Sequence, residues 1–579
     1  MSRNDEIAAL FVELADRLEA QDDPYRPRAY RRAAENIRAH PEPIEAVAEE
    51  GQDALEVIEG VGEAIASKIL EYLESGEITA LEEARAELPV DMAALTRVDG
   101  VGPKTVGDLY EALGITDLDE LEAAAEAEEI RALEGYGETS EANILENIPF
   151  AREARERTLL AHARPLADDL LAYLEAGPAT ERSAAAGSLR RWRETVGDVD
   201  LLAASTDHQA AVDRFTTWDE VEDVIEAGSG KASVRARGLR VDLRVVDPEE
   251  YGSALQYFTG SRDHNVGLRS RAIEQELKVN EYGVFDVSDV PDATEDQRAG
   301  ERVAGATEAS VYDAVGLDWI PPELREDHGE LVAATDGTLP NLLEPGDLRG
   351  DLHMHTDWSD GDLSPAAMIE AAADAGYDYL GIADHATGPG MVGGVGVEDD
   401  ALLELAATIR ELREGATVTV FAGVEANITA DGELSVRDEV LDGLDLVVAS
   451  PHSGLDGDGT DRLLTAIEHP AVDVLGHPSG RMLNRRPGME IDIDAVAEAA
   501  RSNGVALEVN ANPHRIDLWG EAVRRAVEAG ATIAINTDAH RPAEYSHRRY
   551  GVHAARRGWA ETDDVLTART ADEVRDFLH

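Results

Sequence analysis

From residue 347 onward, short apolar segments alternate with stretches of helical periodicity, and this alternation limits the possible fold more than any other feature. The apolar segments read LRGDLHMHT, YDYLGIADH, TVFAGVEAN, LDLVVASPH, VDVLGHP, GVALEVNAN and ATIAINTDAH. The pattern predicts seven parallel strands in a sheet or barrel. Because the active face of a barrel lies at the C-terminal ends of its strands, side chains at these ends should meet in one cleft.

Nearly every predicted strand of this region ends in a histidine, an aspartate or a glutamate. Eleven of the 16 histidines lie after residue 345, and the chain has no cysteine, so a metal site must use imidazole and carboxylate groups. The candidate metal ligands are His353, His355, Asp360, His385, Glu425, His452, His477, Asp538 and His540. Nine ligands exceed the three or four that one zinc takes. They predict two or three Zn²⁺ or Mn²⁺ ions bridged by carboxylate and hydroxide, an arrangement that hydrolyses phosphoesters. Since imidazole must be neutral to bind, hydrolysis is expected to fail below pH ~6.

The chain is strongly acidic, with 119 Asp and Glu against 52 Lys and Arg and a net charge of −67. Taken alone, this balance argues against nucleic-acid binding, which needs cations that neutralise phosphate. The acidic residues are spread along the whole chain, however, and the lysines are only Lys68, Lys104, Lys231 and Lys278. This composition resembles that of proteins from salt-accumulating halophiles. At molar salt the Debye length is about 3 Å, so local contacts would decide binding.

The 579 residues exceed what one hydrophobic core organises, so we expect several domains. No apolar run reaches the ~18 residues of a membrane span. The first residues, MSRNDEIAAL, lack the basic and apolar regions of a signal peptide. These features predict a cytoplasmic protein without a membrane partner.

Residues 1–150 have helical periodicity throughout, and a Gly-x-Gly turn recurs in them three times. It reads GVG within 55–76 and within 95–114, and GYG within 130–148. Each turn precedes a helix, so its backbone N–H groups would form an anion site. Backbone donors bind phosphate without positive side chains, so the turns predict contact with the DNA backbone. Lys68 follows the first turn and is either a surface position or an amine that forms a Schiff base with an abasic sugar.

Three aspartates mark the region that follows. In GSLRRWRETVGDVDLLAAS (187–205), Asp198 and Asp200 are predicted to alternate on a strand, which would place both carboxylates on one face. Asp242 lies within RGLRVDLRVVD, an alternating apolar strand. Adjacent carboxylates repel unless a divalent cation neutralises them. Three on one sheet fit a pair of Mg²⁺ ions that clamp an in-line phosphoryl transfer.

These motifs, with YFTGSRDHN (257–265) and VNEYGVF (279–285), resemble a family X DNA polymerase of the DNA polymerase beta type over residues 1 to about 320. The resemblance implies that Asp198, Asp200 and Asp242 bind the catalytic Mg²⁺ ions. It further implies that the triphosphate, sugar and base of the incoming nucleotide are bound by Gly187, Ser188, Arg191, Tyr257, Phe258, Gly260, Ser261 and Asn265. Lys68 falls at the position of the lyase nucleophile of the family. The chain departs from the family at Arg31, Arg32 and Ala64, where lysine is frequent, and arginine is a poor amine nucleophile.

The strand-end motifs D-L-H-x-H, A-D-H, G-x-E, S-P-H, G-H-P and T-D-A-H resemble the polymerase and histidinol phosphatase (PHP) domain over residues 347–579. All nine ligand positions of that family are present. In a chain that also resembles a polymerase, the substrate implied for the metals is a DNA phosphate. Arg481 in GHPSGR is either a contact to that phosphate or a solvated surface residue.

The predicted fold is multidomain: an all-α helix-hairpin-helix region, an α+β nucleotidyltransferase palm and thumb, and a C-terminal α/β distorted (β/α)7 barrel. The predicted domains are a lyase-like helical domain 1–85, helical fingers 86–150, a palm 151–255, a thumb 256–320, a linker 321–346 and a PHP domain 347–579.

The predicted function is a DNA polymerase with a 3′→5′ exonuclease or 3′-end phosphoesterase, which fills gaps in DNA repair. Its partners would be gapped or primer-template DNA and deoxynucleoside triphosphates, bound by a monomer. The main alternative keeps the hydrolase and reduces the polymerase half to a DNA clamp. A non-enzymatic scaffold and a small-molecule phosphatase are further alternatives. Two complete sets of candidate metal ligands disfavour the scaffold, and the phosphatase leaves the first half of the chain unexplained.

Overall fold

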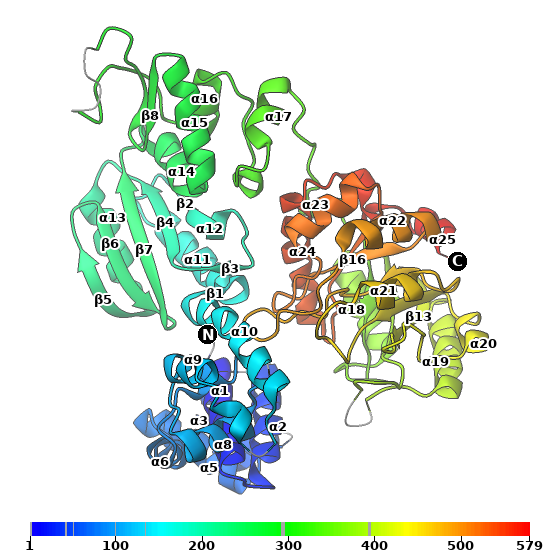
Figure 1. The fold of residues 1–579 in the computed structure, drawn as a ribbon. Helices are drawn as coiled ribbons and strands as arrows, with labels where there is room; N and C mark the ends of the chain where they lie inside the picture. The colour runs from blue at the N-terminus through cyan, green and yellow to red at the C-terminus, as the bar shows by residue number, and fades with distance from the viewer. Residues whose placement is uncertain are drawn as a thin grey trace.

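A computed structural model of the protein describes residues 3–40, 43–49, 51–58, 60–98, 100–133, 135–290, 296–391 and 395–578. Figure 1 shows a helical region in blue, a palm and thumb in cyan and green above it, and a barrel in yellow to red beside them. Within the described ranges, no helix has the length and apolar character needed to cross a membrane. The three parts agree with the fold class that the sequence predicts.

The N-terminal region is entirely helical, as its periodicity predicts. Its elements are α1 Arg3–Ala20, α2 Arg26–Ala39, α3 Ile44–Glu49, α4 Gln52–Leu55, α5 Glu63–Ser75, α6 Thr79–Glu87, α7 Met92–Leu95, α8 Pro103–Leu113, α9 Leu118–Glu126, η1 Ile130–Ala132 and α10 Glu138–Glu156. Two separate cores hold it together, one built from residues 7–84 and the other from residues 88–151. The predicted boundary between residues 85 and 86 therefore lies inside α6, at the junction of the two cores.

The three Gly-x-Gly turns have the same backbone conformation. The first glycine of each turn has a positive φ, +79° at Gly60, +79° at Gly100 and +92° at Gly135. The second glycine of each turn is the N-cap of the following helix, namely Gly62 before α5, Gly102 before α8 and Gly137 before α10. A left-handed φ followed directly by a helix start is a conformation that glycine adopts without strain. The repeat in the sequence is therefore a repeat of one structural device.

The palm is built on a five-stranded sheet in the order β2-β4-β7-β6-β5. Its elements are β1 Thr158–Leu159, α11 Leu160–Glu175, β2 Arg182–Ala185, α12 Gly187–Arg190, β3 Thr195–Val196, β4 Val199–Ala204, α13 His208–Thr216, β5 Val221–Ala227, β6 Lys231–Ala236 and β7 Leu239–Val246. In β7 the side chains of Val241, Leu243 and Val245 are buried, and Asp242 lies on the opposite face. This alternation is the one that the sequence predicts.

The predicted palm–thumb boundary at 255/256 falls inside α14, and the rest of the thumb follows this helix. The elements of the thumb are α14 Tyr251–Thr259, α15 Arg262–Glu274, β8 Leu277–Asn280, β9 Gly283–Asp286, β10 Glu301–Ala304 and α16 Glu308–Ala314. The boundary at 150/151 likewise falls inside α10.

The predicted linker 321–346 is structured, which corrects that expectation. It contains η2 Pro322–Leu324 and α17 Glu330–Asp336, and it ends in η3 Pro345–Asp347. The side chain of Arg325 is fully buried and donates to Glu308 of the thumb and to the Ile320 carbonyl. Four prolines and the lack of a helical period concealed this order, since contacts to other domains rather than local periodicity hold the segment.

The C-terminal domain is a barrel of seven parallel strands in the order β11-β12-β13-β14-β15-β16-β17. The strands are β11 Gly350–Met354, β12 Tyr379–Ile382, β13 Thr419–Asn427, β14 Leu446–Ser450, β15 Val474–Leu475, β16 Ala506–Asn510 and β17 Ile533–Asn536. The helices are α18 Pro365–Asp374, α19 Asp399–Leu412, α20 Asp438–Leu441, α21 Thr460–Ile467, α22 Ile493–Asn503, α23 Gly520–Glu528, η4 Pro542–His547, α24 Arg548–Arg557, η5 Thr562–Asp564, η6 Leu566–Ala568 and α25 Ala571–Phe577. A parallel bridge between Met354 and Ala539 brings the first strand to the end of the last. The seven predicted strands are all present.

Candidate active sites

All nine predicted metal ligands lie together at the C-terminal ends of the barrel strands. His353 and Glu425 lie within strands β11 and β13, and the others follow the ends of β11, β12, β14, β15 and β17. Three overlapping groups have ligand atoms close enough to hold an ion: His355, Asp360, His385 and His540; His353, His355 and Glu425; His385, Glu425 and His452. The alternation of strand and helix thus produces the cleft that it predicts.

Glu425 is the centre of the buried part of this site. Its Oε1 lies 3.0 Å from His477 Nε2, 3.3 Å from His452 Nε2 and 3.4 Å from His353 Nε2. Its Oε2 lies 2.5 Å from His385 Nδ1. The carboxylate is completely buried. A carboxylate among so many imidazoles is in position to bridge neighbouring cations.

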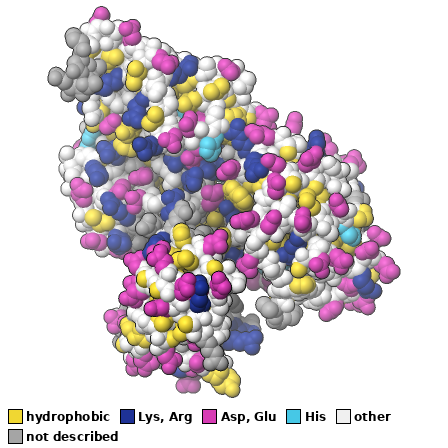
Figure 2. All heavy atoms as spheres, viewed as in Figure 1, with side chains coloured by type: hydrophobic (Ala, Val, Ile, Leu, Met, Phe, Trp, Pro, Cys, Tyr) yellow, Lys and Arg dark blue, Asp and Glu magenta, His cyan; other side chains and the backbone are white. Residues whose placement is uncertain are grey.

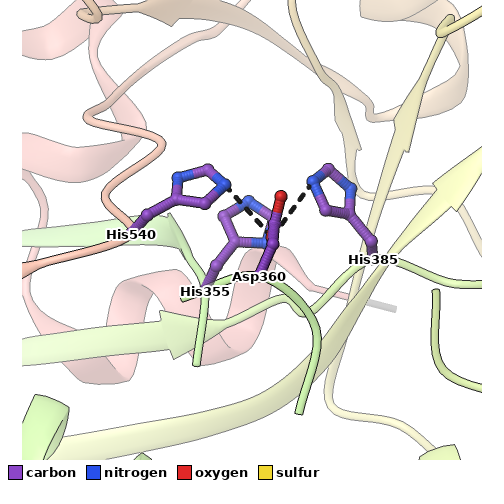
Figure 3. A group of neighbouring side chains, drawn as sticks. All are labelled: His355, Asp360, His385 and His540. Atoms are coloured by element: carbon purple, nitrogen blue, oxygen red, sulfur yellow. Dashed lines mark ion pairs between the residues drawn. The ribbon is translucent and has the colours of Figure 1, made fainter. Parts of the chain in front are cut away.

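The second group lies toward the mouth of the cleft and is drawn in Figure 3. Asp360, on the loop after β11, points between His385 and His540, and its Oδ1 lies 3.6 Å and 3.3 Å from their Nε2 atoms. His355 lies behind them, with its ring centroid 4.3 Å from that of His540. Asp538 completes the set, with Oδ1 3.1 Å from His355 Nε2.

Several imidazole nitrogens of the cluster make no well-aligned hydrogen bond with the described residues, even where a carboxylate is near. They are His353 Nε2, His355 Nδ1, His385 Nδ1, His477 Nδ1 and both ring nitrogens of His452. Buried polar atoms are normally hydrogen-bonded, and unpaired ones are costly. Nitrogens of this kind, gathered around carboxylates, fit divalent transition-metal ions.

Two ligands also have strained backbones. His477 and Asp538 have positive φ values of 23° and 54°. This region of backbone conformation costs a non-glycine residue energy and is concentrated at functional sites, where the surrounding structure holds it. The strain supports a functional role for both positions.

The charges of the cluster shift the pKa values of its members in opposite directions. Burial and the neighbouring His540 and His385 lower the pKa of His355 to about 3, so this imidazole is neutral. Burial also acts on His540, but the hydrogen bond with Asp360 and the charge of Asp538 raise its pKa to about 9. Although burial opposes it, the charges of His452 and His385 hold the pKa of Glu425 well below its usual range. The metal-free site therefore contains both neutral and protonated imidazoles.

Two residues that the sequence motifs did not predict hold the ligands in place. Glu508, on β16, is fully buried, and its carboxylate lies 2.7 Å from His353 Nδ1. It also accepts from the backbone N–H of His477. Asn510 donates to Asp538 Oδ2 at 3.0 Å. Partners of this kind orient metal-binding imidazoles. A glutamate in the middle of the apolar strand ALEVN was the signal that could have revealed this role.

The structure excludes one of the two alternatives for Arg481, and its contact with a substrate phosphate stays a prediction. Its side chain is 14% exposed, so it is not a solvated surface residue. Nε donates to the Arg515 carbonyl at 2.9 Å, and Nη2 donates to the Ile516 carbonyl. The arginine that reaches the ligands is Arg515, whose Nε lies 3.9 Å from Asp538 Oδ2. Both Arg481 and Arg515 follow strand ends in the sequence, and local sequence does not show which of them reaches the metal ligands.

In the palm, Asp200 and Asp242 are directly paired on the parallel strands β4 and β7. The prediction that Asp198 lies on the strand is wrong, because β4 begins at Val199. The exposed side chain of Asp198 lies in the bend before this strand. Burial, together with the charges of Asp242 and Asp198, raises the pKa of Asp200 to about 6. The three carboxylates therefore interact, and this repulsion is what a divalent cation would relieve.

The Gly-Ser turn lies against these carboxylates. Gly187 has a φ of +59°, and a Cβ at this position would lie 2.5 Å from Asp200 Oδ2. Glycine is therefore required here by the backbone conformation and also by the space. The turn that the resemblance assigns to the triphosphate thus touches an aspartate assigned to the metal.

The YFTGS segment reaches the same pocket. Phe258 lines a cavity of about 200 Å³ together with Asp200, Asp242 and Arg244. The guanidinium of Arg244 lies 4.6 Å from the centre of the Phe258 ring. The thumb helix α14 therefore lies across this cavity from the carboxylates of the palm sheet.

Asn265 fixes the turn between α14 and α15. Its amide donates to the carbonyl oxygens of Tyr257 and Gly260 at 2.8 and 3.2 Å. Ser261 caps α15 by accepting from the His264 N–H. The side chains of Asn265 and Ser261 therefore shape the turn in this structure.

Arg191 and Lys68 have partners within the protein. Arg191 Nε donates to Glu326 at 2.9 Å and Nη1 to the Thr259 carbonyl at 2.7 Å. Lys68 lies on α5, half-buried, with Nζ 6.0 Å from the centre of the Tyr30 ring. Binding of a triphosphate by Arg191 would require it to leave Glu326.

Comparison with known proteins agrees with this architecture. Residues 2–78 match the family described as helix-hairpin-helix domain, 92–148 the SAM-like helix-hairpin-helix tandem, 254–326 the DNA polymerase beta thumb and 351–512 the PHP domain. The fold and the two ligand sets therefore define a DNA-polymerase-like chain joined to a metal-binding PHP barrel.

Individual relatives identify the family. The DNA polymerase/3′-5′ exonuclease PolX of Bacillus subtilis (strain 168) is 36% identical over 581 residues, which cover 99% of this chain and 98% of that protein. DNA polymerase lambda of Rattus norvegicus is 26% identical over 333 residues, 54% of each chain. The probable phosphatase YcdX of Shigella flexneri serotype 5b (strain 8401) is 32% identical over 208 residues, which cover 33% of this chain and 78% of that protein. The chain belongs to the PolX family, the family X DNA polymerases that carry a C-terminal PHP domain.

Proposed function

We propose that this protein extends primers in gapped DNA with its palm and removes nucleotides from 3′ ends with its barrel. The observation that carries the proposal is the presence of two complete, separate sets of converging ligands in one chain. Its functional setting would be gap filling during DNA repair, with gapped or primer-template DNA and deoxynucleoside triphosphates as substrates. We further propose that the protein acts as a monomer.

In the palm, Asp198, Asp200 and Asp242 would hold Mg²⁺, which neutralises charge on the transferred phosphates when bound. Gly187, Ser188 and Arg191 would bind the triphosphate. The sugar and base would contact Tyr257, Phe258 and the Gly260–Ser261 turn, which Asn265 shapes. Support comes from the shared cavity of Phe258 with the two aspartates and from the contact of Gly187 with Asp200.

In the barrel, the nine ligands would hold two or three Zn²⁺ or Mn²⁺ ions. Bound ions of this kind supply Lewis-acid activation of water for phosphoester hydrolysis. Glu508 and Asn510 would orient the ligands, and Arg515 is the cation placed to attract a substrate phosphate toward Asp538. The domain limits that we propose follow the two cores of the helical region, the start of α14 and the barrel from residue 347.

A second candidate treats the palm as a DNA clamp without polymerase activity. The raised pKa of Asp200 argues against it. In a clamp that binds no metal, three repelling carboxylates would only destabilise the palm, and neutral side chains at these positions would make the fold more stable. A polymerase needs them to bind metal.

The experiment separates the two sites by paired substitutions, tested on a gapped duplex in KCl with Mg²⁺ or Mn²⁺. The Asp198→Ala/Asp200→Ala variant should lose nucleotide addition and keep 3′-end degradation. The His353→Ala/His355→Ala variant should lose degradation and at least one bound ion, measured by elemental analysis, and keep extension.

Matched controls are Asp223→Ala, an exposed aspartate on β5 of the same sheet, and His469→Ala, a barrel histidine that pairs with Asp438 away from the ligands. Both controls should retain both activities. Primer extension by the aspartate variant would refute the palm assignment. Normal metal content and normal trimming in the histidine variant would refute the hydrolase assignment.

A further inference from the structure

Helix α24 of the barrel domain packs against the polymerase half of the chain and lies at the edge of the barrel that faces it (Figure 1). The ring of His553 stacks on Trp192 of the palm, with centroids 3.6 Å apart and planes at 8°. Arg556 Nε and His553 Nδ1 both bind Glu323 Oε1 at 2.7 Å. Buried side chains of the palm and the barrel also belong to one continuous hydrophobic cluster. The two enzymatic halves are therefore in firm contact.

The last residue of α24, Arg557, joins an ion pair of the polymerase half. Its Nη1 lies 3.2 Å from Glu326 Oε1 and donates to the Arg191 carbonyl at 3.0 Å. The same Glu326 Oε1 accepts from Arg191 Nε at 2.9 Å. All three side chains are nearly buried, with exposed fractions of 13% for Arg191, 10% for Glu326 and 9% for Arg557. One carboxylate oxygen thus accepts hydrogen bonds from two arginines of different domains.

This group borders the turns that we assign to the nucleotide. Arg191 Nη1 donates to the Thr259 carbonyl, next to the Gly260–Ser261 turn. The Ser261 N–H donates to the Arg325 carbonyl, adjacent to Glu326. A change of partner by Arg191 therefore alters contacts next to the Gly260–Ser261 turn.

The base of the Arg557 side chain is also closely packed. A Cβ at Gly520, at the start of α23, would lie 2.7 Å from Arg557 Cβ, so the two helices are in close contact there. A cavity of about 350 Å³, lined by Arg193, Glu326 and Arg557 among others, adjoins the group. It leaves room beside the Glu326 carboxylate for this side chain to move.

We propose that Arg557 of the barrel domain is a positioning residue for nucleotide binding in the palm, because it retains Glu326 when Arg191 turns to the triphosphate. The proposal rests on the proposed polymerase function. Without Arg557, departure of Arg191 would leave a nearly buried carboxylate whose only other cation among the described residues is Arg193, 3.7 Å away and 42% exposed. A buried charge that loses its partner is strongly unfavourable. Arg191 would then stay with Glu326, and nucleotide binding would weaken.

The charge state of Glu326 is consistent with this exchange. Burial opposes ionisation, but the charges of Arg191 and Arg557 lower the pKa of Glu326. The side chain is therefore a carboxylate at neutral pH and competes with phosphate for Arg191. Arg557 weakens this competition by supplying a second positive charge.

The test compares steady-state extension of a gapped duplex by wild type, Arg557→Gln, Glu326→Gln and the double variant. Arg557→Gln should raise the KM for the nucleotide about tenfold and leave kcat within about twofold. Glu326→Gln alone should lower KM, because a neutral amide releases Arg191. The double variant should return KM to near the wild-type value, and 3′-end degradation should be unchanged in all.

Arg556→Gln is the matched control, since it lies on the same helix and interface but binds Glu323. A merely structural role of α24 would move Arg556→Gln and Arg557→Gln alike and would not be reversed by Glu326→Gln. An unchanged KM in both Arg557→Gln and Glu326→Gln, or no rescue in the double variant, would overturn the proposal. If wild type fails to extend primers, the polymerase function itself fails. The same four proteins are then compared by displacement of a fluorescent deoxynucleoside triphosphate, where equal affinities would overturn the role of Arg557.

Discussion

Replacement of Asp200 by asparagine should stabilise the metal-free palm, although it removes a residue assigned to metal binding. Burial and the charges of Asp242 and Asp198 raise the pKa of Asp200 from 3.8 to about 6. A folded-state pKa above the unfolded value means that the folded protein binds the proton more tightly, so stability falls as pH rises from 3.8 to 6. This difference between the folded and unfolded pKa of Asp200 corresponds to about 3 kcal/mol. The asparagine side chain carries no charge and avoids this loss, so the Asp200→Asn variant should be more stable at pH 8.

The assay is native-state hydrogen exchange at strands β4 and β7 in EDTA, because a multidomain chain has no single free energy of unfolding. The gain in opening free energy should be about 3 kcal/mol at pH 8 and about half of that at pH 5. Asp223→Asn, an exposed position on β5, is the control and should change stability by less than about 0.5 kcal/mol. Equal or lower protection of the Asp200→Asn variant at pH 8 would refute the reasoning. A gain of the same size at pH 5 and pH 8 would do so too.

Three further predictions concern the other sites. His540 has a raised pKa, about 9, and the pKa values of His353 and His385 are also raised, so a metal must displace protons, and metal affinity should increase at least tenfold per pH unit from 6 to 8, measured by titration of the metal-free protein. Gly187→Ala should reduce primer extension about 100-fold, because its Cβ would displace the Asp200 carboxylate, 2.5 Å away, while 3′-end degradation measured in parallel stays normal. Lys68→Ala should abolish the weak borohydride-trapped adduct with abasic DNA that we expect of wild type.

Each of these three predictions has its own control or refuting outcome. Metal affinity that is flat between pH 6 and 8 would contradict the protonation of His540, and it would restore the limit near pH ~6 expected from an ordinary imidazole. Gly228→Ala, at an open turn of the same sheet, should extend primers normally. Lys104→Ala replaces an exposed lysine on α8, behind the second Gly-x-Gly turn, and should trap as wild type does. Equal trapping by the Lys68 variant would assign the nucleophile elsewhere.

The elements that the sequence predicts best are those with a local physical signature. Every residue of the barrel strands β11, β14 and β16 is buried, and β14, LVVAS, reads as a nearly continuous apolar run. The Gly-x-Gly turns need a positive φ that glycine adopts without strain, so the sequence also reveals these turns. The alternation in β7 places Asp242 on the face opposite the buried Val241 and Leu243. In each case neighbouring residues contain the reason for the structure.

The features that escaped prediction depend on contacts between distant residues. Glu508 orients a histidine 155 positions earlier, and Arg557 binds a carboxylate 231 positions earlier. The structure of the segment 321–346 depends on contacts of Arg325 and Glu323 with other domains. Its sequence therefore shows no local periodicity. Helices that cross predicted domain limits, such as α14, carry no break in their pattern. No local rule reveals such pairs in one sequence.

The acidic composition and the DNA substrate are reconciled by where the positive groups lie. In Figure 2 acidic side chains occur over every part of the visible face, whereas Lys and Arg gather over the palm. The helical region offers backbone N–H groups at Gly62, Gly102 and Gly137, whose sides are open. Donors of this kind contact phosphate without a charge of their own, and metal ions held by the two ligand sets would supply further positive charge. A net charge of −67 therefore limits where DNA can bind rather than whether it binds. The likeness to proteins of salt-accumulating organisms stays a prediction, and it implies that primer extension persists in molar KCl.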